Sequence, residues 1–516
     1  MKDRTQYTYS SSTKRIAKNT LMLYFRQILI MLVSLYTVRV VLATLGAEDY
    51  GIYNVVAGVV TMFSFLSGSM ASATQRFFSY ALGEGSEEKL KTIFSVNLLV
   101  YIGIALIAVI LLETIGMWFV HDKLNVPQNR LDSVVLLFHL SVFSFVCTIF
   151  SSPFMAIIIA HEDMQLYAYI SIVDTALKLC LVFVLGVISY DRLVSYGALL
   201  AIVSGINTII YVIVCVRMYV ECQFRRFHWN KGLFREICSF TGWSLFGQLT
   251  TVGRAQAVTV LINQMFSPLV VASRSVASQV TGAVNVFATN FNTGMYPAII
   301  KNYASNNKDE MFSLLFRGCK LCFFLIWIFA LPLFVEMEYV LNLWLVNSPD
   351  GVVLFTRLAI IEVVINAICL PLGTAARAPG KMRKYELSLG SIQVGIFVTD
   401  LILFRFFSAS AHIVYVVAAV GNLVMMLVRL VLIKESLCFP VKKFVVQVLG
   451  RLFIVGCVSG CVAWFVGELM SNDFFGIVCS VLVIIAFSIL AMGMMGLSSQ
   501  ERVFIVSKIK GRFGKV

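Results

Sequence analysis

The chain has 516 residues, of which 59% are hydrophobic and 13% are charged, and its formal net charge is +14. Soluble globular domains are usually about 45–50% apolar, so this composition excludes a soluble globular protein and indicates a polytopic membrane protein. Nucleic-acid-binding proteins carry basic faces on soluble modules, so we expect no nucleic-acid partner.

Apolar runs long enough to cross a bilayer recur along the whole chain. A helix of about 20 apolar residues spans the hydrocarbon core, and lipid offers no partner to an open strand edge. We therefore expect an all-α polytopic membrane protein with about fourteen transmembrane helices. The runs begin near Thr20, Gly51, Thr92, Ser133, Leu166, Leu193, Ser239, Leu269, Ser313, Val352, Leu387, Ala411, Gly450 and Phe474.

The two halves of the chain are alike at an offset of roughly 221 residues. Many secondary transporters are built from such repeats, so we predict two pseudo-symmetric six-helix lobes, over 1–216 and 239–434. A cytoplasmic linker, 217–238, joins them, and two additional helices with a basic tail follow over 435–516. The matched positions are Thr20 and Thr241, Phe25 and Phe246, Gln27 and Gln248, and Tyr80-Ala81 and Tyr303-Ala304.

Lysine and arginine gather on alternate loops. Such loops are retained in the cytoplasm, so we expect both chain ends on the cytoplasmic side. The predicted outer loops hold few basic residues. They are also short, so they leave no room for an external catalytic domain. The basic residues of those outer loops are Lys123, Arg130, Arg192 and Arg405.

The twelve cysteines give no sign of a disulfide framework or a metal site. Most lie in apolar runs, where a free cysteine behaves as a small hydrophobe. Cys319 and Cys322 form a lone C-x-x-C, without the second pair that a zinc site needs. No P-loop pattern is present either. We therefore expect no metal, no cofactor and no enzyme activity.

Charged residues inside the predicted helices are the best candidates for function. A charge at bilayer depth costs at least about 2.5–3.5 kcal/mol on insertion scales, so it normally faces a cavity or a partner. Because cations outnumber acids, the interior suits an anionic substrate better than a cationic one. The cations are Arg26, Arg39, Arg76, Lys178, Arg254, Arg274 and Arg357, and the acids are Asp174, Glu362 and Asp400.

Several of these charges have a structural alternative. Asp174 and Lys178 are spaced i, i+4 and can pair on one helix face, which is the interpretation we favour. Arg76 can snorkel to the headgroups, and so can Arg26, Arg39 and Arg274. Arg254 is too deep in the seventh helix to do so easily, and it is the best single candidate for a cavity residue.

The acids and one polar stripe complete the candidate set. Glu362 and Asp400 have no clear partner nearby in sequence, and either one can carry a coupling ion. Polar residues of the eighth helix follow steps of three and four, which places them on one face. Such a stripe can also pack helices together, but here we favour water and substrate. The stripe is Arg274, Ser278, Thr281, Asn285, Thr289 and Asn292.

The run RVVLATLGAEDYGIYNVVAGV, from Arg39 to Val59, resembles the signature that opens bacterial polysaccharide flippases of the Wzx type. These belong to the multidrug/oligosaccharidyl-lipid/polysaccharide exporter superfamily. The second half is similar to a branch described as lipopolysaccharide biosynthesis proteins in Bacteroides-like bacteria. The matching residues there are Asn263, Ala272-Ser273-Arg274, Ala277, Gln279-Val280, Asn285-Val286-Phe287, Asn290-Phe291, Pro297, Ile300-Lys301, Tyr303-Ala304 and Leu343-Trp344-Leu345.

The resemblance implies a cavity that opens alternately to each side of the bacterial inner membrane. Its substrate would be an undecaprenyl-pyrophosphate-linked oligosaccharide, a repeat unit of O-antigen, capsule or exopolysaccharide, with a glycan polymerase and a chain-length regulator as partners. Arginine forks match pyrophosphate oxygens bidentately. The expected roles are pyrophosphate capture for Arg26, Arg254 and Arg274, an outer gate for Arg39, sugar hydrogen bonds for Gln256, Asn285 and Asn292, and ion coupling for Glu362, Asp400 and Asp174.

One departure from the superfamily bears on the substrate. Drug-exporting relatives usually place acids in the first or seventh helix, and this chain has none in either, which disfavours cation antiport. Three interpretations remain open: a lipid-linked oligosaccharide flippase, a multidrug or other small-molecule antiporter of the same fold, and a non-transporting scaffold of a glycan assembly complex. The net charge of the cavity discriminates the first two.

Overall fold

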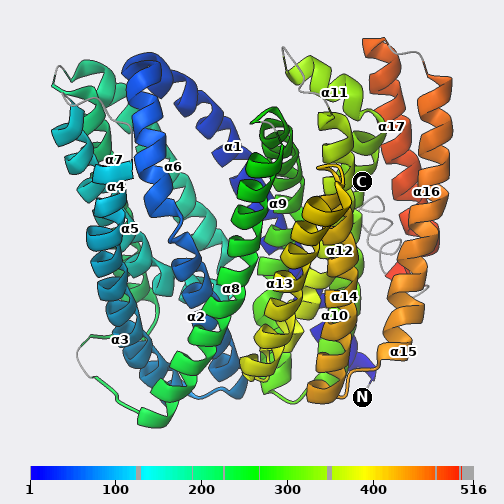
Figure 1. Cartoon of the computed structure of the whole chain (residues 1–516). Helices are drawn as coiled ribbons and strands as arrows, with labels where there is room; N and C mark the ends of the chain where they lie inside the picture. Colours follow the sequence, from blue (N-terminus) through cyan, green and yellow to red (C-terminus); the bar gives the residue numbers. More distant parts are fainter. Residues whose placement is uncertain are drawn as a thin grey trace, which may run out of the picture. The chain divides into compact units, whose positions relative to one another are not determined.

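The computed structural model describes residues 2–123, 130–188, 190–224, 227–266, 268–345, 351–470, 473–498 and 501–502. These residues form helices and no strand, which confirms the all-α fold class (Figure 1). The helices are α1 (Lys2–Thr61), α2 (Ser64–Glu84), α3 (Glu87–Leu111), α4 (Met117–Lys123), α5 (Leu131–Ala160), α6 (Met164–Val187), α7 (Arg192–Met218), α8 (Lys231–Met265), α9 (Pro268–Ala304), α10 (Lys308–Val335), α11 (Met337–Trp344), α12 (Val352–Arg377), α13 (Met382–Phe407), α14 (Ile413–Leu437), α15 (Val441–Phe444), α16 (Gly450–Leu469) and α17 (Phe474–Ala491), with π-helical turns η1 (Leu112–Gly116), η3 (Val445–Leu449) and η4 (Met492–Gly496).

Most of these helices can cross a membrane. In the described part of the chain, eleven segments are long and apolar enough, or twelve if the bent pair Asp49–Thr61 and Ser64–Glu84 forms one span. The two other predicted spans correspond to α8 and α9, which are continuous helices of 35 and 37 residues. These two helices carry Arg254, Arg274 and the polar stripe, so their sequences are less apolar than those of most other helices.

The first two predicted spans meet at Gly46, inside α1. Gly46 has φ 81° and ψ 168°, a region of backbone space that glycine enters without steric cost. Polar contacts hold both sides of this break: Arg192 Nη1 donates to the Thr44 carbonyl at 2.9 Å, and Arg130 Nη2 donates to Asp49 Oδ2 at 2.8 Å. The Leu-Gly of the signature therefore marks the turn between two spans.

The chain divides into two compact units. Unit 1 is Met1–Leu249 with Ile300–Asn307, and unit 2 is Thr250–Ile299 with Lys308–Val516. The divisions fall inside α8 and α9, and residues 231–238 of the predicted linker belong to α8. The lobes over 1–216 and 239–434 therefore stay a prediction, which we keep as a proposal.

Each unit has its own core. In unit 1, α5 packs against α2 and α7, and α1 packs against α6, around buried residues such as Tyr101, Phe138 and Leu181. In unit 2, α12 packs against α10 and α14 around residues such as Phe355 and Tyr415. Helices α16 and α17 lie side by side (Figure 1) and pack against α10.

The repeated Tyr-Ala pairs meet within unit 1. The Tyr80 and Tyr303 ring centroids lie 6.3 Å apart. A Cβ on Gly83 would lie 2.7 Å from the Ala304 Cβ and 2.8 Å from the Lys301 carbonyl oxygen. A side chain at residue 83 would therefore collide with backbone, and glycine is what permits this close approach.

Candidate functional site

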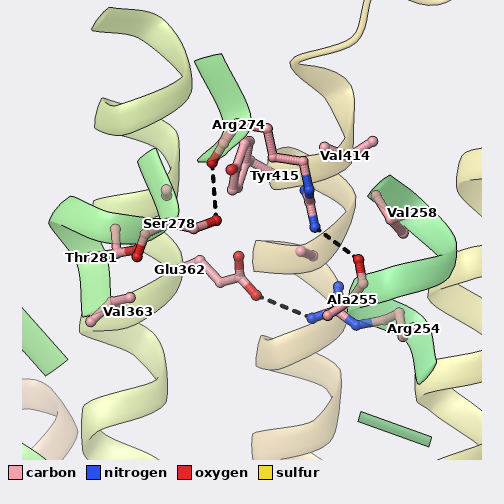
Figure 2. A pocket seen from close by; sticks show the side chains of 12 residues that line it. Arg254, Ala255, Val258, Arg274, Ser278, Thr281, Glu362, Val363, Val414 and Tyr415 are labelled. Atoms are coloured by element: carbon pink, nitrogen blue, oxygen red, sulfur yellow. Dashed lines mark hydrogen bonds and ion pairs between the residues drawn. The ribbon is translucent and has the colours of Figure 1, made fainter. Parts of the chain in front are cut away.

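Unit 2 contains a polar cavity of about 180 Å³ built by four helices (Figure 2). Helices α8 and α9 contribute the arginines, α12 contributes Glu362, and α14 contributes Tyr415. Apart from these side chains the lining is small or apolar, so Arg254, Arg274 and Glu362 supply the charges of the cavity. The lining residues are Arg254, Ala255, Val258, Arg274, Ser278, Thr281, Ala359, Glu362, Val363, Val414, Tyr415 and Ala418.

Arg254 and Glu362 face each other across this cavity (Figure 2). Arg254 Nη2 lies 3.4 Å from Glu362 Oε1, and the two side chains are 15% and 17% exposed. Asn422 Nδ2 donates to the same carboxylate oxygen at 3.2 Å. Charge-assisted hydrogen bonds are usually about 2.7–2.9 Å, so this ion pair is loose. It supplies the partner that Glu362 lacks nearby in sequence.

Arg274 makes a different set of contacts. Its Nε donates to Thr259 Oγ1 at 3.2 Å and its Nη2 donates to the Ala255 carbonyl at 3.4 Å. The guanidinium carbon also lies 5.6 Å from the Tyr415 ring centroid, within cation–π range. In the described ranges no carboxylate pairs with Arg274, so its charge is held by neutral groups.

Asp400 is the second acid close to these arginines. It lies on α13 and is fully buried, and neither carboxylate oxygen has a hydrogen-bond partner within the residues that the structure describes. Arg254, Arg274 and Glu362 are within electrostatic range of it. Two arginines therefore share this region with two carboxyl groups, a balance closer to neutral than the count over all helices suggested.

The predicted stripe of α9 lines the cavity only in its first half. Arg274 is joined there by Ser278 and Thr281, whereas Asn285 and Asn292 are half-buried outside the lining. Asn292 Oδ1 accepts a hydrogen bond from Thr374 at 3.4 Å. Gln256 is exposed on α8 and does not line the cavity either.

The sequence analysis missed two polar residues of α14 at this site. Tyr415 lies against Arg274 and Asn422 donates to Glu362. The two are seven residues apart, so they lie on the same face of α14. That spacing is a signal that could have added α14 to the candidate helices.

Of the other predicted residues, Arg357 lies on α12 in unit 2, where it donates to the Phe334 and Val335 carbonyls at 2.9 and 3.1 Å. The rest lie in unit 1. Arg26 donates to Ser171 at 3.3 Å, and its guanidinium carbon lies 4.5 Å from the Tyr167 ring centroid. Lys178 Nζ lies 2.8 Å from Asp174 Oδ2, which confirms the predicted pair on one helix face. Arg39 is exposed on α1.

The surroundings of Arg76 do not fit the snorkelling interpretation. Its side chain is only 4% exposed, and its Nη1 lies 3.4 Å from Glu236 Oε1. The rings of Phe77 and Tyr80 also lie within 5.0 Å of its guanidinium carbon. Arg76 is thus buried among protein groups and helps to hold the first part of α8 in unit 1.

The fold is that of the MATE transporters. The chain is similar to a MATE transporter in the bent conformation, with a TM-score of 0.72 and 14% identity over 84% of this chain and 97% of that one. It is similar to an outward-facing multidrug resistance MATE family transporter of the MOP superfamily with a TM-score of 0.71 and 15% identity, over 82% of this chain and 96% of that one. For the Vibrio cholerae MATE transporter VcmN in the bent form, the TM-score is 0.66 and the identity is 17%, over 84% of this chain and 99% of that one. At such identities the similarity shows the fold alone.

The sequence defines the family within this fold. The profile of the polysaccharide biosynthesis protein family matches residues 16–303, more than half of the chain, so the chain belongs to that family. The uncharacterized membrane protein EpsK of Bacillus subtilis (strain 168) is 30% identical over 128 residues, a stretch that covers 25% of each chain. Together these findings show a multi-pass membrane protein of the polysaccharide biosynthesis protein family with the fold of a MATE transporter.

Proposed function

We propose that this protein is a Wzx-type flippase without enzyme activity of its own. It moves undecaprenyl-pyrophosphate-linked oligosaccharide across the bacterial inner membrane by alternating access. The observation that carries the proposal is that Arg254 and Arg274, from two different helices, line one polar cavity in a member of the polysaccharide biosynthesis protein family. A pyrophosphate is a concentrated anion whose oxygens match two guanidinium groups.

The contacts of the two arginines suggest an order of events. Arg274 has no carboxylate partner among the described residues, so its guanidinium can meet the incoming phosphate first. Arg254 is held by Glu362 at 3.4 Å, a loose contact that a phosphate oxygen can replace with a shorter one. Capture of the substrate thereby releases the Glu362 carboxylate.

This release is a route to ion coupling. A carboxylate that loses its cation partner gains affinity for a proton or a metal cation. Glu362 and the buried Asp400 are therefore the coupling candidates in unit 2. Asp174 is a weaker candidate, because Lys178 already neutralises it on its own helix.

The remaining predicted residues have secondary roles in this proposal. Gln256 is exposed and Asn285 half-buried, so their amides remain candidates for sugar hydroxyls. Asn292 can serve in the same way if its contact with Thr374 opens. Arg26 remains a candidate for pyrophosphate capture and Arg39 for an outer gate, and both lie in unit 1. The glycan polymerase and the chain-length regulator would act on the product after it has crossed.

The test is complementation of surface glycan display. Arg254→Met and Arg274→Met should each abolish or sharply reduce display at matched protein level. Losing one hydrogen bond to a charged group costs about 1.5–3 kcal/mol, which is at least about tenfold in affinity. Lysine should rescue only partly because it lacks the fork, and glutamate should be worse than methionine.

Arg405→Met is the matched control, since Arg405 is exposed at the end of α13. It should leave display unchanged. Full display with both Arg254→Met and Arg274→Met would overturn the flippase proposal.

A small-molecule antiporter is the second candidate, and the near balance of two arginines and two carboxyl groups favours it. In that case a strain carrying the protein should export a cationic dye, and Glu362→Gln should stop the export while glycan display stays normal. Loss of display without any dye export would exclude this candidate. Loss of display in a deletion strain that both Arg→Met variants restore, with no dye export, would favour the scaffold.

A further inference from the structure

Lys320 is a buried cation in the interior of α10, remote from the polar cavity residues. Its side chain is 6% exposed, and its Nζ lies 2.5 Å from Glu501 Oε2. A buried charge is strongly destabilising without a partner. The carboxylate that supplies the partner comes from the far C-terminal part of the chain, beyond α17.

Hydrogen bonds with Ser498 hold Glu501 beside Lys320. The Ser498 backbone N–H donates to Glu501 Oε2 at 2.7 Å, and the Glu501 backbone N–H donates to Ser498 Oγ at 3.3 Å. This reciprocal pattern is that of a capping box. The same carboxylate oxygen therefore accepts from both Lys320 and the Ser498 backbone, so the Ser498–Glu501 hydrogen bonds and the ion pair form together.

The charges around this carboxylate do not cancel. Arg451 on α16 lies within electrostatic range of Lys320 and forms no ion pair within the described ranges. Arg317 adds positive charge one turn earlier on α10, within range of both Lys320 and Glu501. Among the described residues, Glu501 is thus the carboxylate paired with Lys320, and the charge of Arg451 beside Lys320 suits an anion with more acceptor oxygens than Glu501 offers.

The same face of α10 continues into an apolar groove. Phe324 packs against Gly496, and Trp327 Nε1 donates to Ser459 Oγ at 2.8 Å. These residues follow Lys320 at helical spacing, so they share its face. Beyond them lies a groove of about 610 Å³ between α10, α12 and α16, lined by apolar side chains including Leu331 and Trp464. A cationic site next to an apolar groove matches a headgroup joined to a hydrocarbon chain.

We propose that Lys320 and Arg451 form a binding site for the phosphate of an anionic phospholipid, and that Glu501 occupies this site when the lipid is absent. The phosphate brings the same negative charge as the carboxylate, together with further acceptor oxygens for Arg451. The Glu501 carboxylate is then an intramolecular competitor that leaves Lys320 when the lipid binds. This proposal does not rest on the transported substrate.

Native mass spectrometry of the full chain in detergent tests this competition. The lipids are dioleoylphosphatidylglycerol and, with the same chains and no net charge, dioleoylphosphatidylcholine; inorganic pyrophosphate represents a free phosphate. If Glu501 occupies the site about 90% of the time, Glu501→Gln should strengthen phosphatidylglycerol binding about tenfold. Adding Lys320→Met to Glu501→Gln should remove the gain, and phosphatidylcholine binding should not change.

Glu435→Gln is the matched control, since Glu435 pairs with Lys384 at 2.5 Å but both side chains are exposed. Equal phosphatidylglycerol binding by wild type, Glu501→Gln and Glu435→Gln would overturn the proposal. A gain for pyrophosphate without one for phosphatidylglycerol would overturn the lipid as the occupant. If Glu501→Gln fails to fold, Ser498→Ala removes the hydroxyl that accepts from the Glu501 backbone N–H and keeps the carboxylate. It should give a smaller gain in the same direction, and no gain would count against the proposal.

Discussion

At the scale of residues, the sequence predicted the depth of a charge better than its partner. Arg254 stood out because it is far from both helix ends, and Arg274 because of the stripe that follows it. Glu362 lies 108 residues from Arg254 in the chain, and only the packing of α12 beside α8 brings them together. No local spacing encodes such a contact, so Glu362 looked partnerless and Asn422 was missed.

The Arg254–Glu362 pair gives a prediction about stability. Removing one partner of a fully buried pair costs about 3–5 kcal/mol because a charge is left alone, and the cost should be smaller here because both side chains are partly exposed beside a cavity. Arg254→Gln and Glu362→Gln should therefore each lower the Tm of the detergent-solubilised protein, measured by thermal unfolding. The double substitution should lower it by less than the sum, since contacting residues couple by about 0.5–3 kcal/mol. Strictly additive shifts would mean that the pair does not form.

At the scale of elements, the apolar runs predicted where helices lie but not how closely they approach. Each predicted run coincides with a helix, although α8 begins at Lys231, before the predicted Ser239. Hydropathy marks the part of a helix that lipid or core covers, and a polar extension such as that of α8 escapes it. Close approaches between helices, such as that at Gly83, depend on three-dimensional packing and were not foreseen.

Gly83 and Gly68 form a matched pair on α2. A Cβ at residue 83 would meet backbone atoms of Lys301 at 2.8–2.9 Å, whereas nothing lies within 4 Å of residue 68. Gly83→Ala should destabilise the protein by about 1–3 kcal/mol through overpacking. Gly68→Ala should stabilise α2 by about 0.5–1 kcal/mol, because alanine loses less backbone entropy. Equal Tm shifts for the two variants would contradict the close approach.

A loop between α6 and α7 gives a pH-dependent prediction. Burial alone would raise the pKa of Asp191, but hydrogen bonds from Ser133 and the Leu193 backbone, with the charge of Arg130, lower it below the usual range. A lowered folded-state pKa stabilises the protein above the unfolded pKa of about 4, and this contribution disappears as pH falls through the folded pKa. Asp191→Asn should therefore lower Tm at pH 7 and lower it by less near pH 3. An equal loss at both pH values would mean that the charge of Asp191 is not what stabilises the loop.

At the scale of the whole molecule, composition was sufficient for the class and local motifs for the superfamily. The 59% hydrophobic content required an all-α membrane protein. The Leu-Gly signature pointed to polysaccharide flippases, and the chain belongs to the polysaccharide biosynthesis protein family and has a MATE fold. The extent of the compact units was harder to predict. A connection rich in basic residues looks like a domain boundary in sequence, whereas α8 and α9 are continuous helices whose two ends belong to different units.

The orientation of the chain remains a prediction from loop charge, and cysteine labelling tests it. Lysine-rich loops stay inside, so a cysteine at Glu338 or Asp473 should react with an impermeant maleimide added to intact cells, and one at Lys231 or Lys384 should not. All four positions are exposed in the structure, so a lack of reaction reports the side of the membrane.

Asp49 is a poor probe, because its side chain is buried against Arg130. The background must lack all twelve native cysteines, since several are exposed. After permeabilisation the two lysine positions should also react, which controls for access. External labelling at Lys384 would reverse α13 and break the predicted topology.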